Sequence, residues 1–358
     1  MITQASKYLL LGALLYVSPL VAQNSEKADL AKNLSELFIT DEVLPISLTY
    51  SNKDLRKETN DSTYINTYLR YKKDNLEWDS LEIRIRKRGH NRLENCYYVP
   101  VKIKIKKDER KNTIFDEHKN LKLVMPCLKE KEKDDNVLKE YLVYKLYEIV
   151  SPYHFKARLV DVDFQEEKGK KVKEQRVKGI LVEDDKHVAK RVGGKVMDRQ
   201  IHPLNHSDLE SVRNSFFQYM IGNTDYSNLY LHNTKLLYVE NQIIPVPYDF
   251  DMCGFVHTSY SVVSQINNKQ LPIENVTERI YRGYAREADI MDAVRLEFIG
   301  KRLDFLAVVK KTEQLFEDSR EYETALKYIE SFFEIIMNDS KYDRLIVKEA
   351  RSNEMAKD

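Results

Sequence analysis

The segments LEIRIRKRG (81–89) and VKIKIKK (101–107) decide the fold of the first half of this chain. Both alternate strictly between apolar and charged residues, and the apolar positions are Leu81, Ile83, Ile85, Val101, Ile103 and Ile105. A period of two puts the apolar side chains on one face of a strand and the charged ones on the other. We therefore expect two half-buried antiparallel strands with a basic outer face, either a solvated surface or a face that receives phosphates.

Further elements follow in an order typical of an α+β protein. LKLVMPC (121–127) predicts a third strand, and VLKEYLVYKLYEIV (137–150) has the apolar spacing of a helix. KARLVDVDF (156–164) and KGILVED (178–184) predict two more strands around a charged hairpin loop. HSDLESVRNSFFQYMIG (206–222) predicts a buried helix, and from about Glu274 onward the apolar spacing is almost wholly helical. A sheet-rich lobe at 80–190 therefore precedes a helical lobe at 191–358.

The N-terminus predicts export. Lys7 precedes a short apolar run that ends in small residues near Ala22, a pattern typical of a signal peptide at 1–22, before an extension at 23–79. We expect a periplasmic or extracellular protein with no stable membrane insertion once the signal is removed. In such a compartment a Cys96–Cys127 disulfide is the natural pairing, although three unpaired core thiols fit the sequence equally well.

Charge excludes some partners. The chain holds 58 Lys and Arg against 57 Asp and Glu, a net charge of +1. Such a balance gives no global attraction to nucleic acid, so we expect no nucleic-acid partner and only local basic surfaces.

Two polar clusters suggest chemistry. GNTDYSNLYLHN (222–233) and PVPYDFDMCG (245–254) flank a stretch that predicts a hairpin, and they hold Asp225, Asn228, Asn233, Asp249 and Asp251. Each cluster alone is typical of a turn. Phosphoryl transfer needs a divalent cation held by carboxylate and amide oxygens, and kinases place those ligands on a loop and on the turn of a following strand. If the second cluster is extended, both of its carboxylates project to one side.

A phosphate-binding lysine held by a helix glutamate completes such a site in kinases. Lys122, on the third expected strand, and Glu140, on the following helix, occupy suitable positions. Lys102 and Lys104 are rivals for the lysine role, and a solvated lysine with a surface glutamate is the plainer interpretation.

From about Tyr97 to Val256 the sequence resembles the spore coat protein H type of atypical kinases, a branch of the protein-kinase-like superfamily. The resemblance rests on six elements in order, namely YYVPVKIKIK, NLKLV with LKEYLVYKLY, RLVDVDF, GILVED, IGNTDYSNLYLHN and PVPYDFDMCG. It implies a two-lobed protein-kinase-like fold, with an antiparallel-sheet N-lobe and a mainly helical C-lobe. The family's loop over the phosphates is reduced here to RKRGHNR, with Arg88 and Gly89 kept but no following Ser.

The resemblance also implies an activity, the transfer of a phosphoryl group from ATP to protein hydroxyls with Mg²⁺ or Mn²⁺. Asp225 is then the catalytic aspartate, Asn228 or Asn233 and Asp249 or Asp251 bind metal, and Glu183 lies beside the adenine. Lys122 with Glu140, or Lys104, holds the phosphates.

Two other classes of function fit the same residues. In the first, the chain is an inactive pseudokinase or surface binding module whose acids hold a structural cation. In the second, Asp249-Phe250-Asp251 is the metal-binding acid pair of a nucleotide-sugar transferase.

Overall fold

The computed structural model describes residues 35–72, 77–89, 96–130, 133–266 and 269–352. The signal peptide expected at 1–22 lies outside these residues. Within them, no helix has the length and apolar character needed to cross a membrane.

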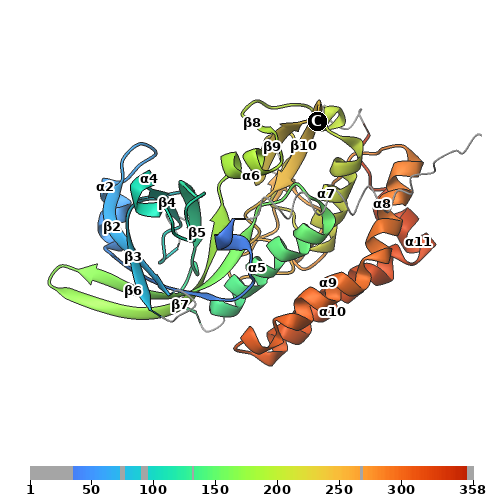
Figure 1. The fold of residues 1–358 in the computed structure, drawn as a ribbon. Helices are drawn as coiled ribbons and strands as arrows, with labels where there is room; N and C mark the ends of the chain where they lie inside the picture. Colours follow the sequence, from blue (N-terminus) through green and yellow to red (C-terminus); the bar gives the residue numbers. More distant parts are fainter. Residues whose placement is uncertain (1–34, 73–76, 90–95, 131–132, 267–268, 353–358) are drawn as a thin grey trace, which may run out of the picture. The chain divides into compact units, whose positions relative to one another are not determined.

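Seven strands form a closed barrel, shown in blue to green in Figure 1. They are β1 (Leu44–Tyr50), β2 (Ile65–Lys72), β3 (Trp78–Lys87), β4 (Val101–Ile105), β5 (Asn120–Val124), β6 (Ala157–Lys168) and β7 (Lys171–Glu183). The order around the barrel is β1-β2-β3-β4-β5-β7-β6. Strand β1 closes it by pairing in parallel with β6, from Leu44 opposite Val160 to Tyr50 opposite Glu166, while the other barrel pairs are antiparallel.

The barrel corrects the expected fold. A two-lobed protein-kinase-like fold with an antiparallel-sheet N-lobe is wrong, because the sheet is mixed and closed. The physical cause is LPISLTY (44–50), which is buried at five of its seven positions and bonds both β2 and β6. Such two-sided pairing removes the free edges that an open sheet would have.

The alternation of apolar residues explains how the barrel is filled. Leu81, Ile83 and Ile85 of β3 point inward together with Val101, Ile103 and Ile105 of β4, and all six are buried. Their charged neighbours lie on the outer face. The strands expected at 81–89, 101–107 and 121–127 are therefore confirmed, and so are the inner and outer faces expected for the first two.

A second apolar core lies outside the barrel. Helix α5 (Lys133–Val150) packs against β6 and β7 on one side and against α7 (Asp208–Met220) and α9 (Arg302–Lys311) on the other. Beside it lies a three-stranded sheet in the order β10-β9-β8, made of β8 (Lys195–Met197), β9 (Thr234–Val239) and β10 (Gln242–Pro247). Its outer two-stranded part, β9–β10, is the hairpin expected between the two polar clusters.

The remaining elements complete the described chain. Figure 1 shows α9 and α10 running side by side. The helices are α2 (Asn52–Glu58), α4 (Lys107–Arg110), α6 (Asp185–Arg191), α8 (Ala288–Gly300), α10 (Ser319–Ile336) and α11 (Asp339–Tyr342), and the last two strands are β11 (Gln265–Ile266) and β12 (Lys269–Gln270). Short 3-10 turns lie at Glu36–Phe38, Pro203–Asn205 and Glu313–Leu315, and a π-helical turn lies at Asp343–Val347.

One covalent link ties the barrel together. Cys96 and Cys127 form a disulfide, which confirms the expected pairing, and Cys253 is a buried free thiol. The bond joins the segment before β4 to the segment after β5.

Candidate functional site

Lys122 lies on the outer face of β5, between two aromatic rings. Its Nζ is 4.7 Å from the ring centre of Phe155 and 4.5 Å from that of Tyr248. Burial, together with the nearby charge of Arg88, lowers the pKa of this ammonium to about 7. Because this ammonium is held against aromatic rings and away from water, an anionic ligand beside it would stabilise its charged form.

Asp249 is the carboxylate next to these cations. Its Oδ2 lies 4.0 Å from Nη2 of Arg88, and its charge opposes the lowering of the pKa of Lys122. The backbone at Asp249 has a φ of +62°, and its N–H donates to the Tyr144 hydroxyl at 3.1 Å. The left-handed conformation turns the chain here, so the second polar cluster is not extended and its two acids do not follow simple alternation.

Other charged groups lie around Lys122, and the charges of Asp185 and Asp184 raise its pKa more than the charge of Asp249 does. Lys102 of β4 pairs with Asp184 at 3.2 Å, and Lys235 of β9 pairs with Asp185 at 3.5 Å. Although burial opposes it, the charges of Lys122 and Lys235 lower the pKa of Asp185. The junction between the barrel and the β8–β10 sheet is thus densely charged, with acids and bases interleaved.

The loop that carries Asp225 is held from both sides of its carboxylate. Oδ1 of Asp225 bonds Nε2 of His232 at 2.9 Å, and Oδ2 accepts from Nδ2 of Asn233 at 3.0 Å. The hydrogen bond to Asp225 raises the pKa of His232, and the charges of Asp225 and Asp249 add to this effect against partial burial. Asp249 therefore acts electrostatically on both His232 and Lys122.

The two loop asparagines have different surroundings. Asn233 has a φ of +50°, and its carbonyl oxygen accepts from Tyr248 N at 3.1 Å, directly before Asp249. Its Nδ2 makes both bonds to Asp225, which leaves Oδ1 as an acceptor. Asn228 instead accepts through Oδ1 from Asn214 at 3.3 Å and from Thr234 at 3.1 Å. Its amide oxygen is thus occupied by helix α7 and strand β9.

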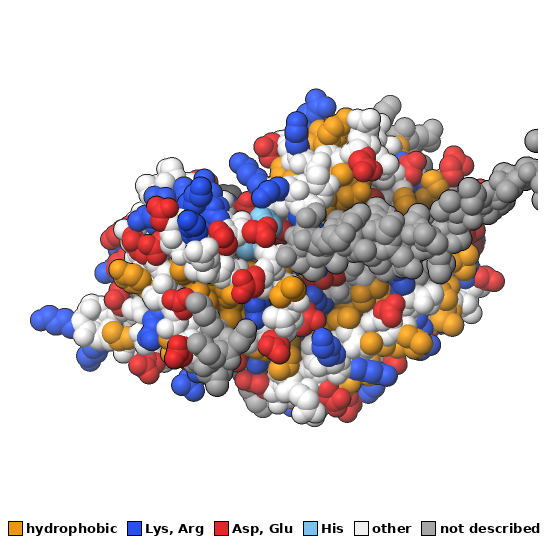
Figure 2. All heavy atoms as spheres, in the orientation of Figure 1, with side chains coloured by type: hydrophobic (Ala, Val, Ile, Leu, Met, Phe, Trp, Pro, Cys, Tyr) orange, Lys and Arg blue, Asp and Glu red, His pale blue; other side chains and the backbone are white. Residues whose placement is uncertain are grey.

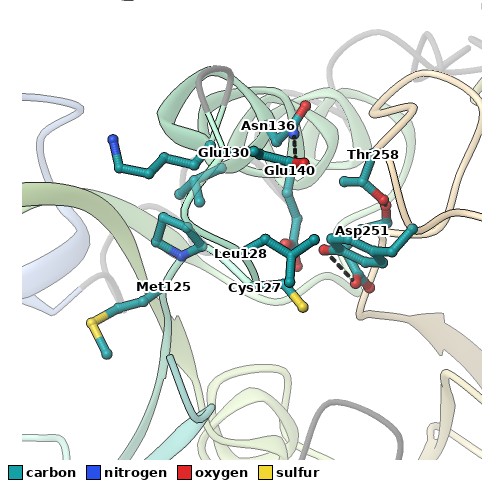
Figure 3. Close-up of a pocket in the computed structure, with 12 residues that line it drawn as sticks. Met125, Cys127, Leu128, Glu130, Asn136, Glu140, Asp251 and Thr258 are labelled. Atoms are coloured by element: carbon teal, nitrogen blue, oxygen red, sulfur yellow. Dashed lines mark hydrogen bonds between the residues drawn. The ribbon is translucent and has the colours of Figure 1, made fainter. Parts of the chain in front are cut away.

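Asp251 and Glu140 lie in a separate small pocket, shown in Figure 3. Its volume is about 10 Å³, the space of a single water molecule. Tyr260 donates to Oδ2 of Asp251 at 3.0 Å, and Thr258 donates to the Asp251 carbonyl at 3.4 Å. Among the described residues no ion pair joins Lys122 to Glu140, because Lys122 lies between Phe155 and Tyr248 whereas Glu140 lines this pocket.

Glu183 is fully buried in an ion-pair network at the end of β7. Arg191 bonds both of its oxygens at 3.1 and 3.0 Å, His187 bonds Oε1 at 2.6 Å, and the backbone N–H of Lys156 donates to Oε2 at 3.0 Å. Although burial opposes it, the His187 bond and the Arg191 charge lower the pKa of Glu183 to about 2. With these four bonds the side chain holds β7, α6 and the segment before β6 together.

Lys104 lies two residues after Lys102 on β4, opposite Arg84 of β3 and Asn120 of β5. Its Nζ is 5.4 Å from the ring centre of Tyr64. It therefore contacts a different aromatic residue from the pair that flanks Lys122.

Three residues of this site escaped the sequence interpretation. His232 lies within the 222–233 cluster, where its sequence indicates no separate role, and Phe155 lies just before the strand expected at 156–164. Arg282 lies 57 positions after Asp225 in the chain, yet its Nη1 donates to the Thr224 carbonyl and its guanidinium lies 5.1 Å from the ring centre of Tyr226. No sequence spacing signals such a contact.

The next feature is the set of side chains that could act as metal ligands. Within the described parts of the chain, no group of three or more His, Cys, Asp or Glu side chains is arranged to hold a metal ion. Mg²⁺ is usually held by one or two carboxylates together with substrate phosphates. Asp249, Asp225 and Oδ1 of Asn233 fit such a partial set chemically, and Asp251 belongs to the other pocket.

No protein-family model matches the chain, and a search of the curated proteins found no match.

Proposed function

We propose that this protein transfers a phosphoryl group from ATP to a protein hydroxyl, with Mg²⁺ or Mn²⁺ bound beside Asp249. Asp249 carries the proposal, because its carboxylate lies 4.0 Å from Arg88 and its charge acts on both Lys122 and His232. A phosphoryl-transfer site needs two groups of residues. One is a set of cations that bind the phosphates, and the other is a loop whose carboxylate contacts the acceptor hydroxyl.

Each residue then has a role. Lys122 and Arg88 bind the phosphates, and a phosphate would restore the full charge of Lys122 by raising its pKa. Asp225 orients the acceptor hydroxyl and takes its proton as oxygen attacks the terminal phosphorus and ADP leaves. Asp249 and Oδ1 of Asn233 hold the cation, which offsets phosphate charge. The likeness to the spore coat protein H type agrees with these roles and remains a hypothesis.

A second candidate is a non-catalytic binding module with a structural cation. It is favoured by the Asp225 carboxylate, whose oxygens are already bonded to His232 and Asn233. The third, a nucleotide-sugar transferase with an Asp-x-Asp pair, has less support, since Asp249 and Asp251 lie in different surroundings.

Labelled ATP tests the proposal. The protein with Mn²⁺ and an acceptor mixture should transfer label, and Asp249→Asn should reduce transfer at least 100-fold, about the contribution of one charged group in a transition state. Asp339→Asn is the matched control, because that carboxylate is 94% exposed and pairs only with Arg295 among the described ion pairs. Equal transfer by both variants, or a folded wild type that binds no nucleotide, would refute phosphoryl transfer. Stabilisation by cations without any response to ATP would favour the binding module.

A further inference from the structure

Four cations lie side by side on the outer face of β3 and β4, namely Arg84, Arg86, Lys102 and Lys104, which we name the cationic face. Arg84 is directly opposite Lys104, and Arg86 is directly opposite Lys102. Lys102 in turn is opposite Lys122 of β5. Like charges directly across neighbouring strands destabilise a sheet, so the barrel holds these residues against their mutual repulsion.

Carboxylates compensate only part of this charge. Lys102 pairs with Asp184, and Arg86 pairs at 2.6 Å with Asp61, whose side chain is 94% exposed. Arg84 and Lys104 form no ion pair with any residue that the structure describes. They lie instead 5.8 and 5.4 Å from the ring centre of Tyr64.

This arrangement differs from the general surface. Figure 2 shows Lys and Arg mixed with Asp and Glu over most of the visible face. All four residues of the cationic face are also partly buried. Partial burial weakens the screening of these charges by water and salt. An anion bound here is therefore attracted more strongly than it would be at an open surface.

We propose that the cationic face binds an acidic segment of polypeptide in an extended conformation. Alternate residues of a strand are about 6.6 Å apart, and neighbouring strands are about 4.8 Å apart. An extended peptide with carboxylates at alternate positions repeats at the same distance, so two of its acids meet Arg84 and Arg86 while Lys104 and Lys102 lie beside them. The aromatic ring of Tyr64 lies beside Arg84 and Arg86 and adds to the same surface.

Charge favours a peptide over a nucleic acid. Proteins that bind nucleic acid commonly contact about 6–10 phosphates along a basic stripe. The cationic face has four cations in a compact group, and the net charge of the whole chain is +1. A short acidic segment matches that number of cations.

The binding itself does not depend on phosphoryl transfer. That the acidic segment belongs to the acceptor protein rests on the proposed function, since Lys102 of the cationic face neighbours Lys122 on β5. The nucleotide phosphates remain assigned to Lys122 and Arg88.

The test is fluorescence anisotropy with a labelled twelve-residue peptide of alternating Glu and Ser, without ATP or metal. The wild type should bind at low ionic strength and bind more weakly as salt is added. Arg84→Gln combined with Lys104→Gln should weaken binding at least tenfold. Removing like-charge neighbours should also raise the Tm of this variant by about 1–2 °C, which separates lost binding from unfolding.

The matched control is Lys107→Gln combined with Lys111→Gln, two exposed residues at the nearby helix α4. It should leave peptide affinity within twofold of the wild type. Failure of the wild type to bind, an equal loss in the control, or tighter binding of a single-stranded oligonucleotide of the same charge would each overturn the proposal. Because ATP is absent, peptide binding by a chain that transfers no phosphate would reject the proposed function and leave this inference standing.

Discussion

Asn233 is joined to Asp225 twice, through one amide nitrogen. Nδ2 of Asn233 donates to the backbone carbonyl of Asp225 at 2.7 Å and to its Oδ2 at 3.0 Å. Asn233 also accepts the N–H of Tyr248, so one residue connects the Asp225 loop to the turn at Asp249. Its φ of +50° is a conformation that asparagine tolerates better than most residues with a side chain.

Two substitutions of Asn233 should distinguish the contribution of its backbone conformation to stability from that of its side-chain amide. Asn233→Ala loses both bonds and strains the backbone, so we expect a loss of about 2–4 kcal/mol in the free energy of unfolding. Asn233→Gly relieves the strain and should recover about 1–2 kcal/mol of it. Urea unfolding measures both. If the amide oxygen also binds metal, Mn²⁺ affinity should fall in both variants; full recovery of affinity in the glycine variant would contradict that role.

Asn228 should behave differently. Its amide oxygen accepts from Asn214 and Thr234, so Asn228→Ala leaves a buried donor on Asn214 without its partner. We expect a cost of about 1–3 kcal/mol in unfolding free energy and a nearly unchanged Mn²⁺ affinity in the folded protein. Isothermal titration below the unfolding temperature checks this. A large loss of affinity with little loss of stability would move the metal role from Asn233 to Asn228.

The Asp225–His232 bond should make stability depend on pH. The folded pKa of His232 is raised above 6.5, so its contribution is fully present below pH 6.5 and is lost as pH rises through the folded pKa. His232→Gln should therefore destabilise the protein more at pH 5.5 than at pH 8.5. Because the side chain is 53% exposed, the difference should stay below about 1 kcal/mol. In an Asp225→Asn background the pH dependence of the substitution should shrink to the part that burial and the charge of Asp249 contribute.

Local alternation predicted the strands, whereas the closure of the barrel had no local signal. Leu81, Ile83 and Ile85 indicate a strand directly, because a period of two can be recognised from residues that are close together in the sequence. The pairing of β1 with β6 joins residues more than 100 positions apart. The apolar residues at alternate positions of β1, from Leu44 to Tyr50, indicate a strand but do not say which strands it pairs with. The segment 23–79 was therefore separated from a sheet to which it contributes two strands.

The site was predicted unevenly for a similar reason. The Asp225 and Asp249 segments do approach each other, because the β9–β10 hairpin between them brings its ends together. The elements expected to hold Glu140 and Glu183 are present, but the surroundings of each side chain come from distant parts of the chain. Glu140 lines a pocket together with Asp251, and Glu183 pairs with Arg191. Sequence order does not encode those surroundings.

The disulfide should contribute strongly to stability. Cys96 and Cys127 are 31 positions apart, and closing a loop of that length restricts the unfolded chain by about 3–4 kcal/mol. Reductant should lower the Tm of the wild type and leave a Cys96→Ser/Cys127→Ser variant unaffected. Counting thiols in the denatured, unreduced protein should give one per chain, from Cys253. Three thiols per chain would show that the bond does not form in solution.

Lys122 should lower the stability of the protein while it serves binding. Its folded pKa of about 7 lies far below the ordinary value of 10.5, so the unfolded chain binds more protons between pH 7 and pH 10.5. Stability from this group therefore rises with pH across that window, and its cost is complete below pH 7. Replacing a desolvated charge with an apolar side chain of similar length often stabilises a protein by about 1–4 kcal/mol.

Lys122→Met should accordingly raise the free energy of unfolding at pH 6, with a gain that shrinks toward pH 10. The lost contacts with Phe155 and Tyr248 are replaced in part by the thioether, which also packs well against aromatic rings. The same variant should lose at least tenfold in ATP affinity, because Arg88 alone remains to hold the phosphates. Urea unfolding at several pH values and a nucleotide titration measure the two effects. A variant that is less stable at pH 6, or that binds ATP normally, would show that Lys122 has a structural role and not a ligand-binding one.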